Sequence, residues 1–128
     1  MLDLLIRGGN VVFPDGVLNA DIGIRGGIVA MIAPHIMLPA QKTIDARGLY
    51  VMAGVVDAHV HFNEPGMGAW EGFATGSAAL AAGGCTTYID MPLNGLPPTV
   101  TVAAMQQKLD SARDSGSYVD YALWGGLV

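Results

Sequence analysis

This chain is poor in charged residues and has a single cysteine. Charged side chains make up 13% of its 128 residues, about half of the roughly 25% found in ordinary soluble domains. Hydrophobic residues make up 52%, and a polypeptide this apolar is either covered by a larger body or placed in a membrane. The lone Cys85 excludes an internal disulfide. A cytoplasmic location is therefore the expectation, with Cys85 acting as a small buried hydrophobe.

The chain also lacks a long uninterrupted apolar run and any cluster of basic residues. The charge-free stretch over residues 72–89 contains four glycines, so it is predicted as a helix, a turn and a strand rather than one membrane-spanning helix. The N-terminus has an acid at position 3 and no basic region, so no secretory signal is expected. The net charge is −5 and no cluster of Lys or Arg exists, so neither nucleic acid nor an anionic membrane is expected as a partner.

The first 50 residues have the pattern of an all-β segment. Residues 2–12 are predicted as a strand broken at Gly8-Gly9, and the turn over residues 25–27 predicts a hairpin. A short strand is expected over residues 43–45, followed by a turn at Arg47-Gly48. These strands are too few to close a sandwich or a barrel on their own.

From residue 50 onward, predicted strands alternate with predicted helices. The second helix has an apolar stripe of Val102, Met105, Leu109 and Ala112, and it is expected to end near Gly116. Alternation with continuous apolar strands indicates a parallel α/β sheet. A (β/α)₈ barrel needs about 250 residues, so about three of its eight units are expected here. The elements are strand 55–61, helix 70–81, strand 86–91, the second helix, and strand 118–124.

Two histidines spaced by one residue end the first of these strands. Side chains alternate along a strand, so His59 and His61 are predicted to share one face with Asp57. Two imidazoles side by side form half of a site for a divalent metal. Active sites of α/β barrels lie where the strands end, so we favour metal binding over the alternative of hydrogen-bonded core histidines.

Four segments carry further motifs: residues 51–66, 70–77 and 81–87, and residues 90–94 with 97–99. They resemble the cyclic amidohydrolases, the group that contains dihydroorotase, hydantoinase (dihydropyrimidinase) and allantoinase. Dihydroorotases usually have an arginine where this chain has Asn63, and an amide cannot replace a guanidinium as the partner of a carboxylate. The runs over residues 63–66 and 91–94 favour allantoinase. The chain departs from the group at Ala53 and over residues 67–69.

The resemblance implies a binuclear divalent metal site at the start of a (β/α)₈ barrel. Residues 1–50 would form part of a small β-sandwich domain, and residues 51–128 the first units of the barrel. Zinc is the expected metal, with cobalt, manganese or iron as alternatives, and His59 and His61 would bind the more buried ion. A bridging lysine, two further histidines and a general-base aspartate are expected downstream. Lys108, placed by the pattern off the apolar stripe, is not expected to be the bridge.

Other residues receive roles from their positions. Asn63 and Asn94 are predicted to bind substrate, with turn capping as an equal alternative for Asn94. Asp57 and Asp90 are predicted to orient ligands from behind, although a structural role is favoured for Asp90. Three further expectations are loop geometry for residues 64–66, core packing for Trp70 and Phe73, and a surface or structural role for His35.

The predicted function is metal-dependent hydrolysis of a cyclic amide, with allantoin opened to allantoate as the favoured reaction. The alternatives are dihydroorotase or hydantoinase activity and, from another class, a non-catalytic scaffold with an amidohydrolase-like fold. The resemblance also implies a small cyclic ureide as substrate and a homo-oligomer, a tetramer, as the whole protein. The 128 residues alone are expected to be an incomplete and inactive piece, which neither folds stably nor catalyses.

Overall fold

A computed structural model describes all residues, 1–128. The chain divides into two compact units, Met1–Ala53 and Gly54–Val128. The first unit contains only strands, whereas the second alternates strands and helices. No helix has the length and apolar character needed to cross a membrane.

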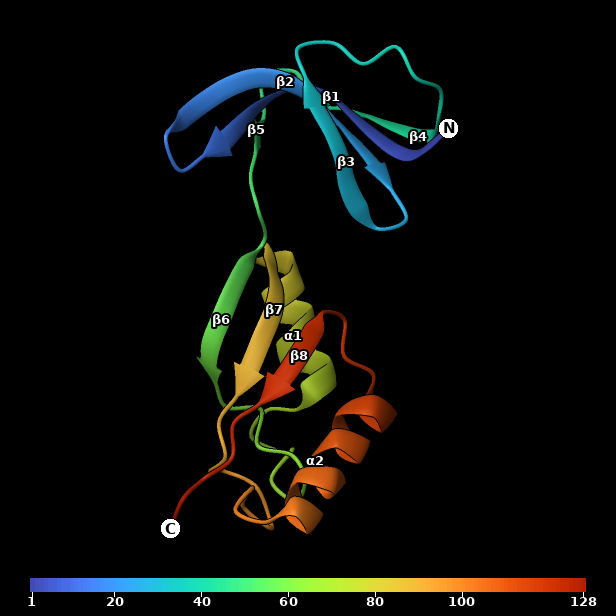
Figure 1. Cartoon of the computed structure of the whole chain (residues 1–128). Helices are drawn as coiled ribbons and strands as arrows, with labels where there is room; N and C mark the ends of the chain where they lie inside the picture. The colour runs from blue at the N-terminus through green and yellow to red at the C-terminus, as the bar shows by residue number, and fades with distance from the viewer. The chain divides into compact units, whose positions relative to one another are not determined.

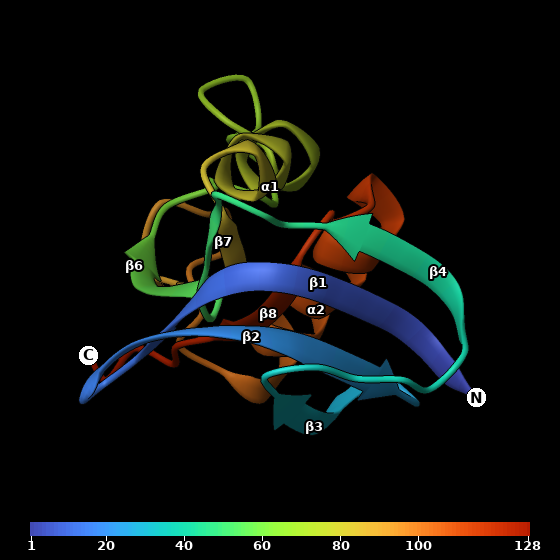
Figure 2. The same ribbon diagram turned by 90° about the horizontal axis from the view of Figure 1, so that it is seen from above.

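The first unit is one twisted sheet of five strands. Its strands lie in the order β3-β2-β1-β4, and β5 also pairs with β1. Figure 2 shows β1 lying between β2 and β4. The strands are β1 (Leu2–Phe13), β2 (Gly16–Arg25), β3 (Ile28–Ala33), β4 (Ala40–Asp45) and β5 (Tyr50–Val51).

The predicted break in the first strand is wrong, whereas the predicted hairpin is confirmed. β1 continues through Gly8, whose φ of 66° goes with a register shift against β2 between Ile6 and Gly9. An irregularity of this kind absorbs the glycine without ending the strand. The hairpin between β2 and β3 turns at Gly26 and Gly27, which have φ values of 61° and 74°. Two successive positive φ values match the strand twist and favour glycine.

The second unit is a parallel sheet of three strands with two helices. Its strands lie in the order β6-β7-β8, and their carboxyl ends lie at one edge of the sheet (Figure 1). This alternation is the predicted start of a (β/α)₈ barrel, and each element lies within a few residues of its predicted range. The elements are β6 (Val55–Val60), α1 (Phe73–Ala82), β7 (Cys85–Asp90), α2 (Val102–Ser115) and β8 (Asp120–Leu123).

An aromatic cluster forms the core of this unit. The Phe62 ring lies 4.8 Å from the Tyr88 ring and 6.0 Å from the Phe73 ring, measured between centroids. Gly76 of α1 leaves room for Phe62, because a Cβ atom at Gly76 would lie 2.2 Å from Cε1 of that ring. Packing of its ring therefore fixes Phe62, the residue directly after His61. Cys85 is buried as expected.

Two packing predictions in this unit are wrong. The buried face of α2 consists of Ala104, Lys108 and Ala112, while Val102 of the predicted stripe is 88% exposed. Lys108 is therefore on the packed face, because its neighbours one turn away are small and leave space for a long side chain. Trp70, predicted in the core, is 72% exposed because α1 begins three residues later at Phe73, which is fully buried.

Candidate metal centre

His59 and His61 lie together at the carboxyl end of β6, and both are exposed. Their ring centroids are 5.3 Å apart. With a Zn–N distance of about 2.1 Å and a ring centre about 1.1 Å beyond the nitrogen, two imidazoles on a tetrahedral ion have centres about 5 Å apart. The spacing of this pair therefore fits two ligands of one metal ion.

Asp57 does not join the two histidines as a third ligand. Its Oδ1 accepts a hydrogen bond of 3.1 Å from the backbone N–H of His59. The carboxylate thus supports the strand that carries the histidine. The chain brings together no group of three His, Cys, Asp or Glu side chains that could hold a metal ion. Any complete metal site needs ligands besides this pair.

The backbone on both sides of His61 is fixed by hydrogen bonds to the end of β7. The carbonyl oxygen of Val60 accepts from the N–H of Met91 at 2.9 Å. The N–H of Phe62 donates to Oδ1 of Asp90 at 2.8 Å. Asp90, predicted to orient ligands from behind, therefore contacts the backbone next to His61 rather than an imidazole.

Sequence reasoning missed the partner of Asp90, which is Lys108. The two side chains form an ion pair and are 0% and 1% exposed. Nζ of Lys108 also donates to the carbonyl oxygen of Met91 at 2.7 Å. A signal for this burial was present in the sequence, because Ala104 and Ala112 lie four residues to either side of Lys108 and mark a face of small residues.

The two asparagines predicted to bind substrate share a backbone conformation but differ in exposure. Asn63 and Asn94 have φ values of 62° and 61°, in the left-handed region that asparagine tolerates better than most residues. Asn63 is 6% exposed, and its Oδ1 has no hydrogen-bond partner. Asn94 is exposed. Only Asn94 is thus open to solvent, and substrate binding by either residue stays a prediction.

Glu64 fastens the loop after the histidines to α2. Its Oε2 accepts hydrogen bonds from Oγ of Ser111 at 3.0 Å and from Oγ of Ser115 at 2.7 Å. These contacts agree with the expected role of residues 64–66 in loop geometry.

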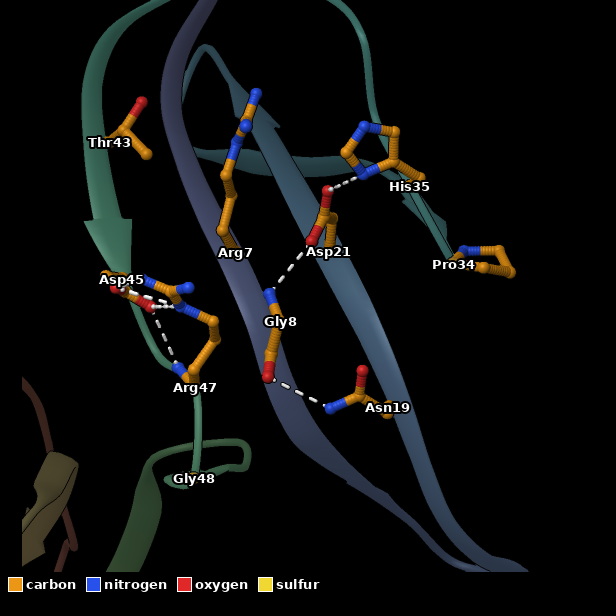
Figure 3. Close-up of a pocket in the computed structure, with 10 residues that line it drawn as sticks. All are labelled: Arg7, Gly8, Asn19, Asp21, Pro34, His35, Thr43, Asp45, Arg47 and Gly48. Carbon is orange, nitrogen blue, oxygen red and sulfur yellow. Dashed lines mark hydrogen bonds and ion pairs between the residues drawn. The ribbon is translucent and has the colours of Figure 1, made fainter.

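The first unit has a separate pocket of about 670 Å³, shown in Figure 3, which contains neither His59 nor His61. At its floor, the buried Asp21 accepts hydrogen bonds from the N–H groups of Gly8 and Ile36 at 2.8 and 2.9 Å. Nδ1 of His35 lies 3.6 Å from Oδ2 of Asp21. The exposed His35 therefore has the surface position expected of it.

Hydrogen bonds and nearby positive charges lower the pKa values of two carboxyl groups in this pocket. Burial raises the pKa of Asp21, but the hydrogen bonds from Ile36 and Gly8, with the charges of His35 and Arg7, bring that pKa below its ordinary value of 3.8. Hydrogen bonds from Arg47 lower the pKa of Asp45 to about 2. The pocket therefore carries two ionised carboxylates at neutral pH.

Comparison with known proteins identifies the family. A model described as the amidohydrolase family matches residues 50–126. The chain belongs to the amidohydrolase family. It is 50% identical to a protein named allantoinase from Deinococcus radiodurans, over 99% of this chain and 28% of that protein. A protein of the same name from Rubrobacter xylanophilus is 51% identical over 98% of this chain and 27% of its own length.

A solved amidohydrolase structure has the same arrangement of elements. It is the L-hydantoinase (dihydropyrimidinase) from Arthrobacter aurescens, with a TM-score of 0.90 and 38% identity. The match covers 98% of this chain and 28% of that structure. The predicted family and fold class are thus confirmed, and the chain spans little more than a quarter of the length of the relatives that it matches.

Proposed function

We propose that the protein containing this chain hydrolyses a cyclic amide with divalent metal ions, and that its substrate is allantoin, opened to allantoate. The structural observation that supports metal binding most is the His59–His61 pair, with ring centroids 5.3 Å apart at the carboxyl end of β6. The resemblance to the cyclic amidohydrolases, together with the match to the amidohydrolase family, supports a binuclear site. The choice of allantoin is supported by relatives named allantoinase at about 50% identity over nearly the whole chain.

The two histidines suit the first half of such a site. As neutral imidazoles they are ligands for zinc, and equally for cobalt, manganese or iron, so the chain's own residues do not select the metal. A bound divalent ion lowers the pKa of water toward about 7 and polarises the amide carbonyl. Asp57 and Asp90 steady the backbone that carries the two ligands. The remaining ligands and the general base would come from outside these 128 residues.

The choice of an uncharged substrate is supported by the asparagines that follow β6 and β7. A substrate carboxylate calls for a guanidinium partner, whereas the buried Asn63 stands where such an arginine would be and the exposed Asn94 offers an amide. Amides donate and accept hydrogen bonds, as does the neutral ring of a cyclic ureide. An uncharged substrate such as allantoin therefore suits these residues better than dihydroorotate does.

An assay of the whole protein tests the proposal. Purified protein, loaded with zinc, cobalt or manganese in turn, is given allantoin, dihydroorotate and dihydrouracil. We expect the highest kcat/KM for allantoin. Preferred turnover of dihydroorotate or dihydrouracil would refute the substrate assignment while leaving cyclic amide hydrolysis intact.

The second candidate function is that of a hydantoinase. It is favoured by one observation, the TM-score of 0.90 with an L-hydantoinase structure. The assay with dihydrouracil distinguishes hydantoinase activity from the hydrolysis of allantoin. A non-catalytic scaffold is the third candidate, and a metal analysis decides that case: a whole protein that binds no zinc, cobalt, manganese or iron would support the scaffold.

A further inference from the structure

We infer that Asp90, held in place by Lys108, is a positioning residue for the metal ligand His61. This inference rests on the proposed metal function. Its starting observation is the burial of both charged groups, with 0% and 1% of the side chains exposed. A buried carboxylate needs a charged partner and several hydrogen bonds to remain ionised.

The contacts of this pair converge on the end of the strand that carries the histidine. Asp90 Oδ1 accepts from the N–H of Phe62, the residue directly after His61. Lys108 Nζ donates to the carbonyl oxygen of Met91, whose own N–H donates to Val60, the residue directly before His61. The backbone on both sides of His61 is therefore held by residues 90 and 91.

Asp90 and Lys108 also join β8 and α2 to this strand end. The carbonyl oxygen of Asp90 accepts a hydrogen bond of 2.9 Å from the N–H of Trp124, directly after β8. Lys108 belongs to α2, so its ion pair connects this helix with the end of β7, while hydrogen bonds of Asp90 to Phe62 and Trp124 reach the ends of β6 and β8. Groups that fix the orientation of metal ligands tune metal affinity even though they do not touch the ion.

Packing alone does not account for a charged pair at this place. A matched apolar pair usually stabilises a core as well as a buried ion pair does. An apolar residue at position 90, however, offers no acceptor to the N–H of Phe62. The difference between the two arrangements is thus the hydrogen bond next to His61, and this is the feature to test.

Two double variants of the whole protein isolate that bond. Asp90→Asn/Lys108→Met removes both charges but keeps an oxygen for the N–H of Phe62, whereas Asp90→Leu/Lys108→Met removes the acceptor as well. Asp21→Asn is the matched control, because Asp21 is also buried and accepts two backbone hydrogen bonds, but in the first unit. The probe is Co²⁺ added to metal-free protein, followed by its visible absorption spectrum and its dissociation constant.

We expect the variant with asparagine and the Asp21 control to bind Co²⁺ within about threefold of wild type, and the variant with leucine to bind about 10- to 100-fold more weakly with an altered spectrum. Equal affinity in all variants, or equal loss in both double variants, would overturn the positioning role while the proposed function stands. A wild-type protein that binds no Co²⁺ would overturn the proposed function itself. Far-UV circular dichroism of each variant checks that the protein is folded, so that the Co²⁺ affinities of folded proteins are compared.

Discussion

Lys108 of α2 and Asp90 of β7 form a buried ion pair across 18 positions of sequence, and the lysine also donates to Met91 of the same strand end. The helix and the sheet edge are thus joined through charges that solvent does not reach. Removal of one partner leaves the other as an unpaired buried charge, which is far more costly than the loss of a surface pair.

Lys108→Ala should therefore destabilise the whole protein by about 3–5 kcal/mol, measured by urea unfolding. Lys42→Ala is the control, since Lys42 is the other lysine among these 128 residues and is exposed; its effect should stay within about 0.5 kcal/mol. Similar effects for the two variants would contradict the role assigned to the pair.

Gly76→Ala should destabilise the protein although alanine favours helices. The added Cβ would lie 2.2 Å from Cε1 of Phe62, so the ring has to move within the core. Overpacking costs about 1–3 kcal/mol, and three atoms of the Phe62 ring within 2.8 Å of the new Cβ put this site toward the upper end, above the helix-propensity gain of about 1 kcal/mol. Thermal unfolding measures the change.

A double-mutant cycle with Phe62→Leu checks the cause of that effect. The smaller side chain leaves space for the new methyl group, so Gly76→Ala should be less harmful in the Phe62→Leu background than in wild type. Additive effects would show that the clash with Phe62 is not the reason.

Local patterns predicted much of this fold, and long-range pairing accounts for what they missed. The apolar run before His59 and the stop at Gly83-Gly84 depend on nearby residues, and β6 and α1 lie close to their predicted ranges. Helical spacing marks the face of Ala104, Lys108 and Ala112, but it does not reveal that Asp90 of another element is the partner of Lys108. Similarly, strand alternation predicted that Asp57 shares a face with the histidines. In the structure the Asp57 carboxylate accepts a hydrogen bond from the backbone N–H of His59 and does not join the two imidazoles.

Asp21 should make the stability of the protein depend on pH in the acid range. Its pKa in the folded state is below the unfolded value of 3.8, so its ionised form stabilises the fold above that value. The stabilisation is lost as the pH falls through the lower folded pKa. The difference in unfolding free energy between wild type and Asp21→Asn should therefore be largest above about pH 5 and shrink on acidification.

Urea unfolding at a series of pH values measures this difference. Asp15→Asn serves as the control, because Asp15 is exposed in the turn between β1 and β2. A gap between wild type and Asp21→Asn that stays constant from neutral to acid pH would contradict the linkage.

His59→Asn and His61→Asn should each abolish tight metal binding with little change in stability. Both histidines are exposed at the end of β6, so their removal creates no cavity. Loss of one of two adjacent imidazoles removes the chelate that the 5.3 Å spacing provides. Bound zinc or cobalt, counted per whole protein by elemental analysis, should fall by about one ion, and kcat with allantoin should fall by at least about 100-fold. His35→Asn, an exposed histidine in the first unit, should leave both quantities unchanged. Full metal content in either strand-end variant would show that the pair does not bind the ion.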